Sequence, residues 1–285
     1  MYSTLISPQE CLKALETNPI ILDCRFQLND TEAGRRAYLL GHLPTAQYVH
    51  LDKDCSGRIG PLTSRHPLPE MQIFLQRVAA WGITKERQVI LYDDQGGSFA
   101  ARLWWMLKTI GVESTAVLDG GSIGWQALNL PLTTEITHPL PAPRFVINND
   151  WQFITTMQMQ KFSRDPEYLI IDARSPERYA GLQEPIDFKA GHIPSAINRF
   201  HGLNFDQKGF FKSPDALRKE FLELLGSYTP EKSIFYCGSG VTSCAHLLAM
   251  EVAGLPGARL YAGSWSEWIK YQENPVITLN ENDIV

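Results

Sequence analysis

Short apolar runs of strand length alternate with longer segments of helical period along the chain. Val89 to Tyr92 and Thr115 to Leu118 are apolar runs, and Phe99 to Ile110, between them, has apolar residues at helical spacing. Runs that are apolar throughout are typical of strands buried on both faces, and an intervening helix connects parallel strands. The pattern predicts an α/β fold in which helices cover parallel sheets.

The second half of the chain repeats this succession. A strand, a helix and a strand are expected over Ser233 to Tyr236, Ser243 to Ala253 and Arg259 to Tyr261. Each half also opens with a helical stretch before its first buried strand, at Pro8 to Glu16 and at Phe153 to Phe162. The two halves therefore have the same predicted order of elements.

Four short sequence blocks also occur twice in the same order, and the number of residues between the two copies of a block changes only slightly from one block to the next. Such an ordered recurrence indicates a tandem duplication. The paired blocks are Leu22-Asp23-Cys24-Arg25 with Ile171-Asp172-Ala173-Arg174, Gly41-His42-Leu43-Pro44 with Gly191-His192-Ile193-Pro194, Val89-Ile90-Leu91-Tyr92-Asp93 with Ser233-Ile234-Phe235-Tyr236-Cys237, and Val117-Leu118-Asp119-Gly120-Gly121-Ser122 with Arg259-Leu260-Tyr261-Ala262-Gly263-Ser264.

A proline-rich stretch marks the junction of the two copies. The chain has 285 residues, about twice the commonest size of one domain, and three prolines fall between Pro139 and Pro143. Such a composition disfavours helix and is typical of a semi-rigid linker. We expect one domain over residues 1–138, a linker over 139–149 and a second domain over 150–285.

Composition and charge exclude several classes of function. Hydrophobic residues make up 44% of the chain, and 26 basic residues stand against 31 acidic ones. This balance lacks the basic stripe of a nucleic-acid or anionic-membrane binder, and no apolar run reaches the ~20 residues of a membrane helix. The N-terminus shows no secretory signal. Five cysteines without a CxxC pair or zinc-like spacing favour reduced thiols, no metal and a cytoplasmic protein.

One cysteine directly follows a predicted strand and leads into a glycine-containing loop. The loop reads Cys237-Gly238-Ser239-Gly240-Val241-Thr242. Backbone N–H groups and a helix N-terminus converge at such a place, which lowers a cysteine pKa from about 8.5 to between ~3.5 and ~7.5. Cys237 is therefore a candidate thiolate nucleophile. The first copy has Asp93 there, and the pair Asp93-Asp94 would repel an anion, so we expect that domain to be catalytically inert.

Taken together, these motifs resemble tandem-domain rhodanese-type sulfurtransferases of the 3-mercaptopyruvate and thiosulfate sulfurtransferase family. The resemblance rests on Cys237 to Thr242, the two Gly-His-(Leu/Ile)-Pro blocks and Gly263-Ser264-Trp265-Ser266-Glu267-Trp268, and it extends over nearly the whole chain. It implies two rhodanese-like domains, each a mostly parallel central sheet flanked by helices. It also implies transfer of a sulfane sulfur through a persulfide on Cys237, without a cofactor.

The residues after the cysteine bear on the sulfur donor. Neutral Gly238 and Ser239 are similar to the pattern of 3-mercaptopyruvate enzymes, whereas thiosulfate-preferring members carry basic residues there. Arg178 matches the family's substrate-binding arginine, and its planar fork suits a carboxylate. The second arginine usual in mercaptopyruvate enzymes is absent from Gln183 to Phe188. We expect 3-mercaptopyruvate as the donor, with thiosulfate as the alternative.

The resemblance also implies a serine, a histidine and an aspartate that handle the proton of the donor thiol. Ser239 and His66 match the first two, and the aspartate falls at Asp52 or Asp54, of which Asp52 fits better. In this arrangement the aspartate orients the imidazole, which takes the proton. The loop residues expected to bind the substrate are Gly238, Gly240, Val241 and Thr242.

The expected acceptor is cyanide or a thiol such as that of thioredoxin, and no nucleic acid or membrane is expected as a partner. A persulfide carrier that serves a partner protein is a further alternative. Cys244, seven residues past Cys237, is a candidate resolving thiol. The physiological acceptor and the oligomeric state do not follow from the sequence.

Several conspicuous residues are expected to have structural roles. Arg25 and Arg174 follow strand-end aspartates in both copies, and His42 and His192 are duplicated likewise, so pairing and packing explain them. The tryptophans are expected mainly in cores, at Trp104, Trp105, Trp265 and Trp268. Gly120 to Gly124 fits the G-x-S-x-G pattern of a hydrolase, but the second copy lacks that pattern at the same place, which favours a turn.

Overall fold

A computed structural model describes residues 1–143, 145 and 151–279. The chain divides into two compact units that are not contiguous in sequence. Unit 1 comprises Met1–Gly57, Leu68–Gln152 and Phe205–Phe211, and unit 2 comprises Arg58–Pro67, Phe153–Asn204 and Lys212–Val285. Each unit thus holds one short segment from the opposite half of the sequence. Residues 58–67, the inserted segment of unit 2, carry His66. In the expected linker over 139–149, residues 144 and 146–149 lie outside the described residues.

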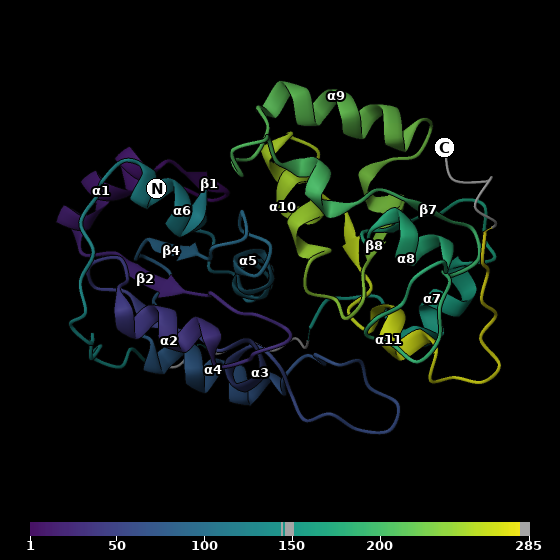
Figure 1. The fold of residues 1–285 in the computed structure, drawn as a ribbon, viewed down its shortest axis with the longest axis horizontal. Helices are drawn as coiled ribbons and strands as arrows, with labels where there is room; N and C mark the ends of the chain where they lie inside the picture. The colour runs from purple at the N-terminus through teal and green to yellow at the C-terminus, as the bar shows by residue number, and fades with distance from the viewer. Residues whose placement is uncertain (144, 146–150, 280–285) are drawn as a thin grey trace. The chain divides into compact units, whose positions relative to one another are not determined.

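Unit 1 contains a parallel sheet with the strand order β1-β5-β4-β2-β3. Strands β1, β4 and β2 of this sheet are labelled in Figure 1. Parallel strands need long connections, and here helices cross the sheet faces between them. Strands that are neighbours in the sheet are therefore not always consecutive in the sequence. The strands are β1 (Leu5–Ile6), β2 (Ile20–Asp23), β3 (Gln47–Tyr48), β4 (Val89–Tyr92) and β5 (Thr115–Leu118), and the helices are α1 (Pro8–Ala14), η1 (Leu15–Thr17), α2 (Ala33–Leu40), α3 (Leu51–Asp54), α4 (Met71–Ala80), α5 (Ala100–Thr109) and α6 (Gly121–Ala127).

Unit 2 contains a second parallel sheet, with the order β7-β6-β8-β9. Its central strands β6 and β8 correspond to β2 and β4 of unit 1. The strands are β6 (Leu169–Asp172), β7 (Ala196–Asn198), β8 (Ser233–Tyr236) and β9 (Arg259–Leu260), and the helices are α7 (Thr156–Phe162), α8 (Pro176–Ala180), η2 (His201–Asn204), α9 (Pro214–Leu225), η3 (Pro230–Lys232), α10 (Cys244–Val252) and α11 (Ser264–Trp268).

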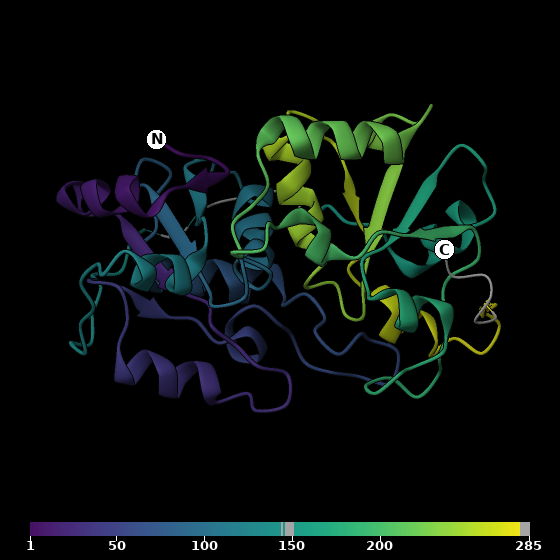
Figure 2. The same cartoon turned by 45° about the horizontal axis from the view of Figure 1, so that its top comes forward.

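Strand β8, one of the two central strands of unit 2, buries side chains on both faces of its sheet. Phe235 of β8 packs against Phe221 of α9, with ring centroids 6.5 Å apart. Ile234 and Tyr236 point the other way and share a core cluster with Trp265 of α11. Figure 2 shows the helices on both sides of this sheet. This two-sided burial explains the continuous apolar runs in the sequence, and the expected α/β fold is confirmed.

Helix boundaries differ from the sequence expectations by a few residues. The helix expected from Phe153 begins at Thr156, because the Thr155 hydroxyl and the Gln158 side chain form a reciprocal capping box. The first helix begins at Pro8, as expected, and its last turn becomes the 3₁₀-helix η1.

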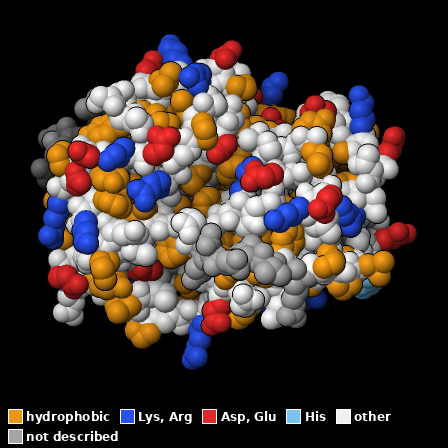
Figure 3. Space-filling view, turned by 180° about the vertical axis from the view of Figure 1, so that it is seen from behind, with side chains coloured by type: hydrophobic (Ala, Val, Ile, Leu, Met, Phe, Trp, Pro, Cys, Tyr) orange, Lys and Arg blue, Asp and Glu red, His pale blue; other side chains and the backbone are white. Residues whose placement is uncertain are grey.

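The surface carries charges of both signs. On the face drawn in Figure 3, basic and acidic side chains are interspersed across the described residues. Among the described residues, every helix is too short or too polar to span a bilayer.

Candidate active site

The loop after β8 places Cys237 between the sheet and α10. The Cys237 side chain is buried, at 2% exposure. Its N–H donates to Ser264 Oγ at 3.1 Å, and its carbonyl accepts from the Trp265 N–H at 3.0 Å. Gly240 has φ = +77°, and a Cβ there would lie 2.3 Å from the Ala262 carbonyl oxygen. The loop is therefore fixed against the start of α11, and it requires glycine at position 240.

The loop stabilises a thiolate at Cys237. Burial alone would raise the pKa of the thiol, but hydroxyl groups of Thr242 and Ser243 and backbone N–H groups of Ser239 and Ser243 outweigh it. The net result is a pKa below the ordinary cysteine value. Ser243 Oγ is buried and has no other hydrogen-bond partner among the described residues, so it remains available to the sulfur. The anion nest expected from the sequence thus uses two side chains as well as backbone.

Three other thiols lack this environment. Burial raises the pKa of Cys11 to about 12 and also raises those of Cys24 and Cys55. Cys244 is fully buried, and its S–H donates to the Gly240 carbonyl at 3.5 Å. None of the five cysteines, all of which lie within the described residues, forms a disulfide. Of Cys11, Cys24, Cys55 and Cys237, Cys237 alone has a pKa below the ordinary cysteine value, and it is the nucleophile selected from the sequence.

A histidine and a serine meet beside the cysteine loop. His66 Nδ1 lies 2.8 Å from Ser239 Oγ, and both side chains are about nine-tenths buried or more. His66 comes from the inserted segment, far from Ser239 in sequence. The structure therefore brings together the serine and histidine that the sequence resemblance implied.

Helix α11 holds the inserted segment in place. The Ser64 N–H donates to Glu267 Oε2 at 3.2 Å, and the Arg65 N–H donates to Ser266 Oγ at 3.1 Å. The Lys270 ammonium donates to two carbonyl groups of the same segment. These contacts fix the backbone from residue 60 to residue 65, so the side chains of Arg65 and the adjacent His66 are positioned by unit 2 itself.

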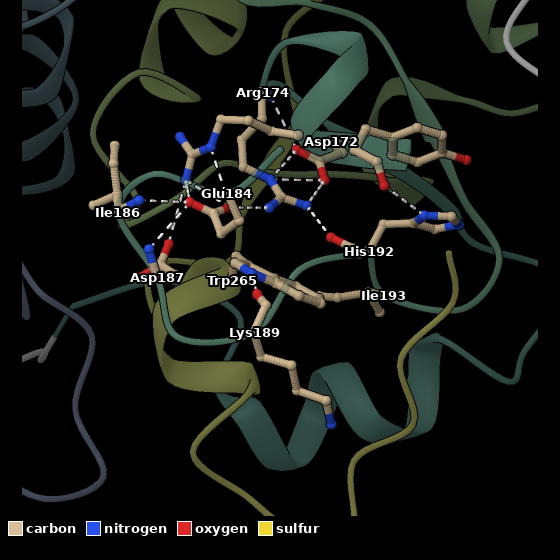
Figure 4. A network of polar contacts seen from close by, with 12 residues as sticks. Asp172, Arg174, Glu184, Ile186, Asp187, Lys189, His192, Ile193 and Trp265 are labelled. Carbon is tan, nitrogen blue, oxygen red and sulfur yellow. Dashed lines mark hydrogen bonds and ion pairs between the residues drawn. The ribbon is translucent and has the colours of Figure 1, made fainter. Parts of the chain in front are cut away.

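Arg178 lies on α8 and is paired with two acidic side chains. Its Nη2 donates to Glu184 Oε1 at 2.7 Å and lies 3.3 Å from Asp187 Oδ2. Glu184 is shared with Arg174, which also pairs with Asp172, as Figure 4 shows. Burial tends to raise the pKa of Glu184, but the Arg178 hydrogen bonds and charge lower it below its ordinary value.

A second guanidinium, from Arg65, reaches the same loop. Its Nη1 lies 3.2 Å from Asp187 Oδ1, so Asp187 bridges Arg65 and Arg178. A Cβ placed on Gly238 would lie 2.6 Å from Arg65 Nη2 and 3.5 Å from Arg178 Nη2. Sequence reasoning missed Arg65, although its position next to His66 was a signal. Two arginines therefore flank the residue after Cys237.

The candidate aspartates belong to unit 1, on and beside α3. The Asp52 N–H donates to His50 Nδ1 at 3.2 Å. The Asp54 carboxylate is engaged within the unit, because it accepts from the His50 N–H at 2.8 Å and pairs with Arg77. The role of Asp52 as the third member of the proton-handling set stays a prediction.

The equivalent loop of unit 1 is filled by its own side chain. Both carboxylate oxygens of Asp93 accept backbone N–H groups, from Gln95 and Gly97 at 2.8 Å each and from Phe99 and Ala100 at 2.7 and 2.9 Å. Burial raises the pKa of Asp93, and these four N–H groups oppose that shift. The carboxylate occupies the anion cradle that the thiolate occupies in unit 2.

Comparison with known proteins agrees with this geometry. The rhodanese-like domain matches twice, at residues 7–128 and 155–271. The chain belongs to the rhodanese-like family. Both rhodanese-like domains were expected from the sequence, and the family assignment confirms them.

Relatives of this rhodanese-like protein are sulfurtransferases. A probable 3-mercaptopyruvate sulfurtransferase of Pseudomonas aeruginosa is 38% identical over 276 residues, covering 96% of this chain and 97% of that protein. The thiosulfate sulfurtransferase of Bos taurus is 31% identical over 279 residues, covering 94% and 92%. The solved 3-mercaptopyruvate sulfurtransferase from Leishmania major superposes with a TM-score of 0.84 at 28% identity, covering 95% of this chain and 75% of that one. The prediction of a sulfurtransferase is confirmed.

The duplicated residues of both rhodanese-like domains are structural, as expected. Arg25 pairs with Asp23 at 2.6 Å in unit 1, as Arg174 pairs with Asp172 in unit 2. His42 stacks on Tyr38 with ring centroids 3.8 Å apart. His192 stacks on its own tyrosine in the same way. The expected core tryptophans are buried, and Trp265 lies beneath the Arg174 guanidinium.

Proposed function

We propose that this sulfurtransferase takes a sulfane sulfur from 3-mercaptopyruvate and passes it, through a persulfide on Cys237, to a thiophilic acceptor. The observation that carries the proposal is the hydrogen bond between His66 and Ser239, beside a stabilised thiolate. Mercaptopyruvate must move a proton when its sulfur leaves, whereas thiosulfate carries no such proton. A buried serine–histidine pair next to the nucleophile serves the first donor and is unnecessary for the second.

Binding begins with the donor carboxylate. Arg178 lies beside Gly238, and the positive charge of its guanidinium attracts the donor carboxylate. The neutral residues Gly238 and Ser239 leave the loop free of a basic side chain that would favour a dianion. The carboxylate end of the donor is therefore held beside the loop, with its thiol directed to Cys237.

Sulfur transfer is a displacement at the donor sulfur. The Cys237 thiolate forms an S–S bond to that sulfur, and the C–S bond breaks with its electron pair on carbon. The resulting enolate of pyruvate takes up the proton that the donor thiol gives up, so pyruvate leaves and Cys237 carries a persulfide anion. The loop hydroxyl and N–H groups that stabilise the thiolate also lie close enough to stabilise the developing persulfide charge.

Ser239 and His66 relay the proton in this scheme. The Ser239 hydroxyl oxygen accepts the proton of the donor thiol and passes its own proton to His66 Nδ1, which lies 2.8 Å away. Asp52 is proposed to orient the imidazole ring. In the second half-reaction cyanide or an acceptor thiol attacks the outer sulfur; with cyanide, thiocyanate leaves and the Cys237 thiolate is regenerated. Thiols such as that of thioredoxin are the proposed protein acceptors.

The decisive test is to trap the intermediate. The protein is treated with 3-mercaptopyruvate without an acceptor, and the Cys237 peptide is examined by mass spectrometry after alkylation. We expect one added sulfur atom on Cys237, pyruvate released in equal amount, and neither in Cys237→Ser. A wild-type protein that releases pyruvate without sulfur on Cys237 would overturn the mechanism.

Thiosulfate is the second candidate donor. The two guanidinium groups beside Gly238 also suit a dianion, and one relative is named a thiosulfate sulfurtransferase. Turnover of both donors by the same preparation, measured as kcat/KM, decides between them. A persulfide carrier would instead show normal loading from a partner persulfide after Arg178→Ala, with turnover of both small donors slow.

We propose a cytoplasmic location for the protein. Five cysteines outside disulfides, among them a reactive thiolate, favour a reducing compartment. Cell fractionation with thiol-trapping of Cys237 tests this location, since recovery of a disulfide-linked protein from an oxidising compartment would contradict it.

A further inference from the structure

Arg65 presents an unused pair of N–H groups to the catalytic loop. Its Nη1 is paired with Asp187, whereas Nε is buried and has no hydrogen-bond partner among the described residues. Its Nη2 lies beside Gly238, 2.6 Å from where a Cβ would stand, and likewise has no hydrogen bond within the described part of the chain. Nε and Nη2 form one edge of the guanidinium, and that edge binds a carboxylate through two parallel bonds.

Arg178 has less free donor capacity. Its Nε and Nη2 are already bound to Glu184, and Nη2 also reaches Asp187. The edge with bidentate geometry is therefore occupied by a protein carboxylate. This leaves Nη1 of Arg178 for an incoming anion, and one N–H group gives weaker and less directional binding than a fork.

We propose that Arg65 is the principal binding group for the carboxylate of the sulfur donor and that Arg178 supplies a second, lateral contact. Asp187 is the positioning residue, because its two oxygens hold both guanidinium groups beside Gly238. Burial of Asp187, at 4% side-chain exposure, keeps this bridge away from water. The arrangement selects an α-keto acid donor whose carboxylate stands a short distance from its sulfur. The inference deepens the proposed function and rests on it.

Two alkylating reagents test this without requiring sulfur transfer. Bromopyruvate has the frame of mercaptopyruvate with bromide in place of the thiol, and its ethyl ester lacks the carboxylate charge. Either reagent forms a C–S bond to Cys237 as bromide leaves. The second-order rates of Cys237 alkylation, followed by peptide mass spectrometry, give an acid-to-ester ratio for each variant. This ratio reports recognition of the carboxylate, and the ester rate alone reports thiolate reactivity.

We expect Arg65→Gln to lower the acid-to-ester ratio by about 10- to 100-fold, because the variant loses charge-assisted hydrogen bonds to the carboxylate. The ester rate should stay near that of the wild type. Arg65→Lys, which keeps the charge and loses the fork, should recover only part of the ratio. Arg58→Gln is the matched control, because Arg58 is an exposed arginine of the same inserted segment. It should leave both rates unchanged.

The proposal is overturned if Arg65→Gln keeps the wild-type ratio, or if only Arg178→Gln lowers it. A fall of the acid and ester rates together would also overturn it, because that result assigns Arg65 to the reactivity of the thiolate. Steady-state kinetics add a second readout, in which Arg65→Gln raises KM for mercaptopyruvate more than it lowers kcat. If the wild type does not turn over mercaptopyruvate, the proposed function fails, and the alkylation ratio still decides the role of Arg65.

Discussion

His66 Nδ1 and Ser239 Oγ lie 2.8 Å apart although 173 positions separate them in the sequence. Both side chains are buried, at 6% exposure each. A hydroxyl in this setting exchanges protons with the imidazole more readily than with bulk water. The pair therefore gives the cysteine loop a route for one proton, which is the feature that separates the two candidate donors.

Ser239→Ala is expected to affect the donors unequally. Removal of a proton-transfer group should lower kcat/KM for 3-mercaptopyruvate by about 100-fold or more. Transfer from thiosulfate releases sulfite without a proton step, so its rate should stay close to that of the wild type. Initial-rate assays with both donors and cyanide as acceptor measure the difference, and Ser239→Thr, which keeps a hydroxyl, should retain part of the activity.

Equal losses with both donors would contradict this prediction. That outcome would mean that Ser239 acts by shaping the loop, since its N–H also contributes to the thiolate site. His66→Gln provides the second arm of the experiment, because it should produce the same unequal loss if the histidine and the serine act together.

Thr242→Val should raise the pKa of Cys237. The Thr242 hydroxyl is the first of the groups that lower this pKa against the opposing effect of burial, and valine has the same shape without the hydroxyl. Because the thiolate is the reactive form, the pH profile of alkylation by iodoacetamide should move to higher pH and activity should fall most on the acidic side. Thr242→Ser, with its hydroxyl intact, should keep the wild-type profile. An unmoved profile in Thr242→Val would contradict the role of Thr242 and leave the pKa to the Ser243 hydroxyl and the backbone N–H groups.

Most of the fold could be predicted from the sequence because it depends on local patterns. Val89 to Tyr92 and Ser233 to Tyr236 are strands over the expected residues, since every side chain in them is buried. Helix ends were less predictable. The start at Thr156 depends on a capping box in which Gln158 reaches back to Thr155, and the same residues would also fit inside a longer helix.

The cysteine loop and Arg178 were predictable, and Arg65 and the acidic partners of Arg178 were not. Cys237 and the loop glycines form one contiguous motif, so their roles follow from local geometry. Arg65 contributes a side chain to a loop that is distant in sequence, and only the packing of the inserted segment on α11 brings the two together. From the sequence, a second arginine was expected only between Gln183 and Phe188, and that stretch has none. In the structure it supplies acidic partners of Arg178 instead.

Arg25→Met and Arg174→Met should lower stability in their respective units. Each arginine is almost fully buried and paired with a buried aspartate, so its removal leaves an uncompensated charge that costs about 3–5 kcal/mol. Urea unfolding measures the loss. In Arg25→Met, alkylation of Cys237 per folded molecule should be unchanged, because Arg25 belongs to unit 1. A stable Arg25→Met protein with a slowed thiolate would contradict the structural role assigned to both residues.

The two aspartates of the loop after β4, Asp93 and Asp94, should respond to substitution in opposite ways. Asp93→Ala leaves four backbone N–H groups without their acceptor, so the free energy of unfolding should fall by about 3 kcal/mol. Asp94 is the matched control. Its Oδ1 is buried without a hydrogen-bond partner among the described residues, and burial, together with the charge of Asp93, raises its pKa.

Proton linkage gives the direction in which Asp94→Asn changes the stability of the protein. An acid whose pKa is higher in the folded state than in the unfolded state binds more protons when folded, so stability falls as the pH rises through the interval between the two values. Asp94→Asn should therefore stabilise the protein at neutral pH and have little effect at acidic pH. Denaturant unfolding at two pH values measures this. Loss of stability in Asp94→Asn equal to that in Asp93→Ala would mean that both carboxylates support the loop, whereas the contacts assign that role to Asp93 alone.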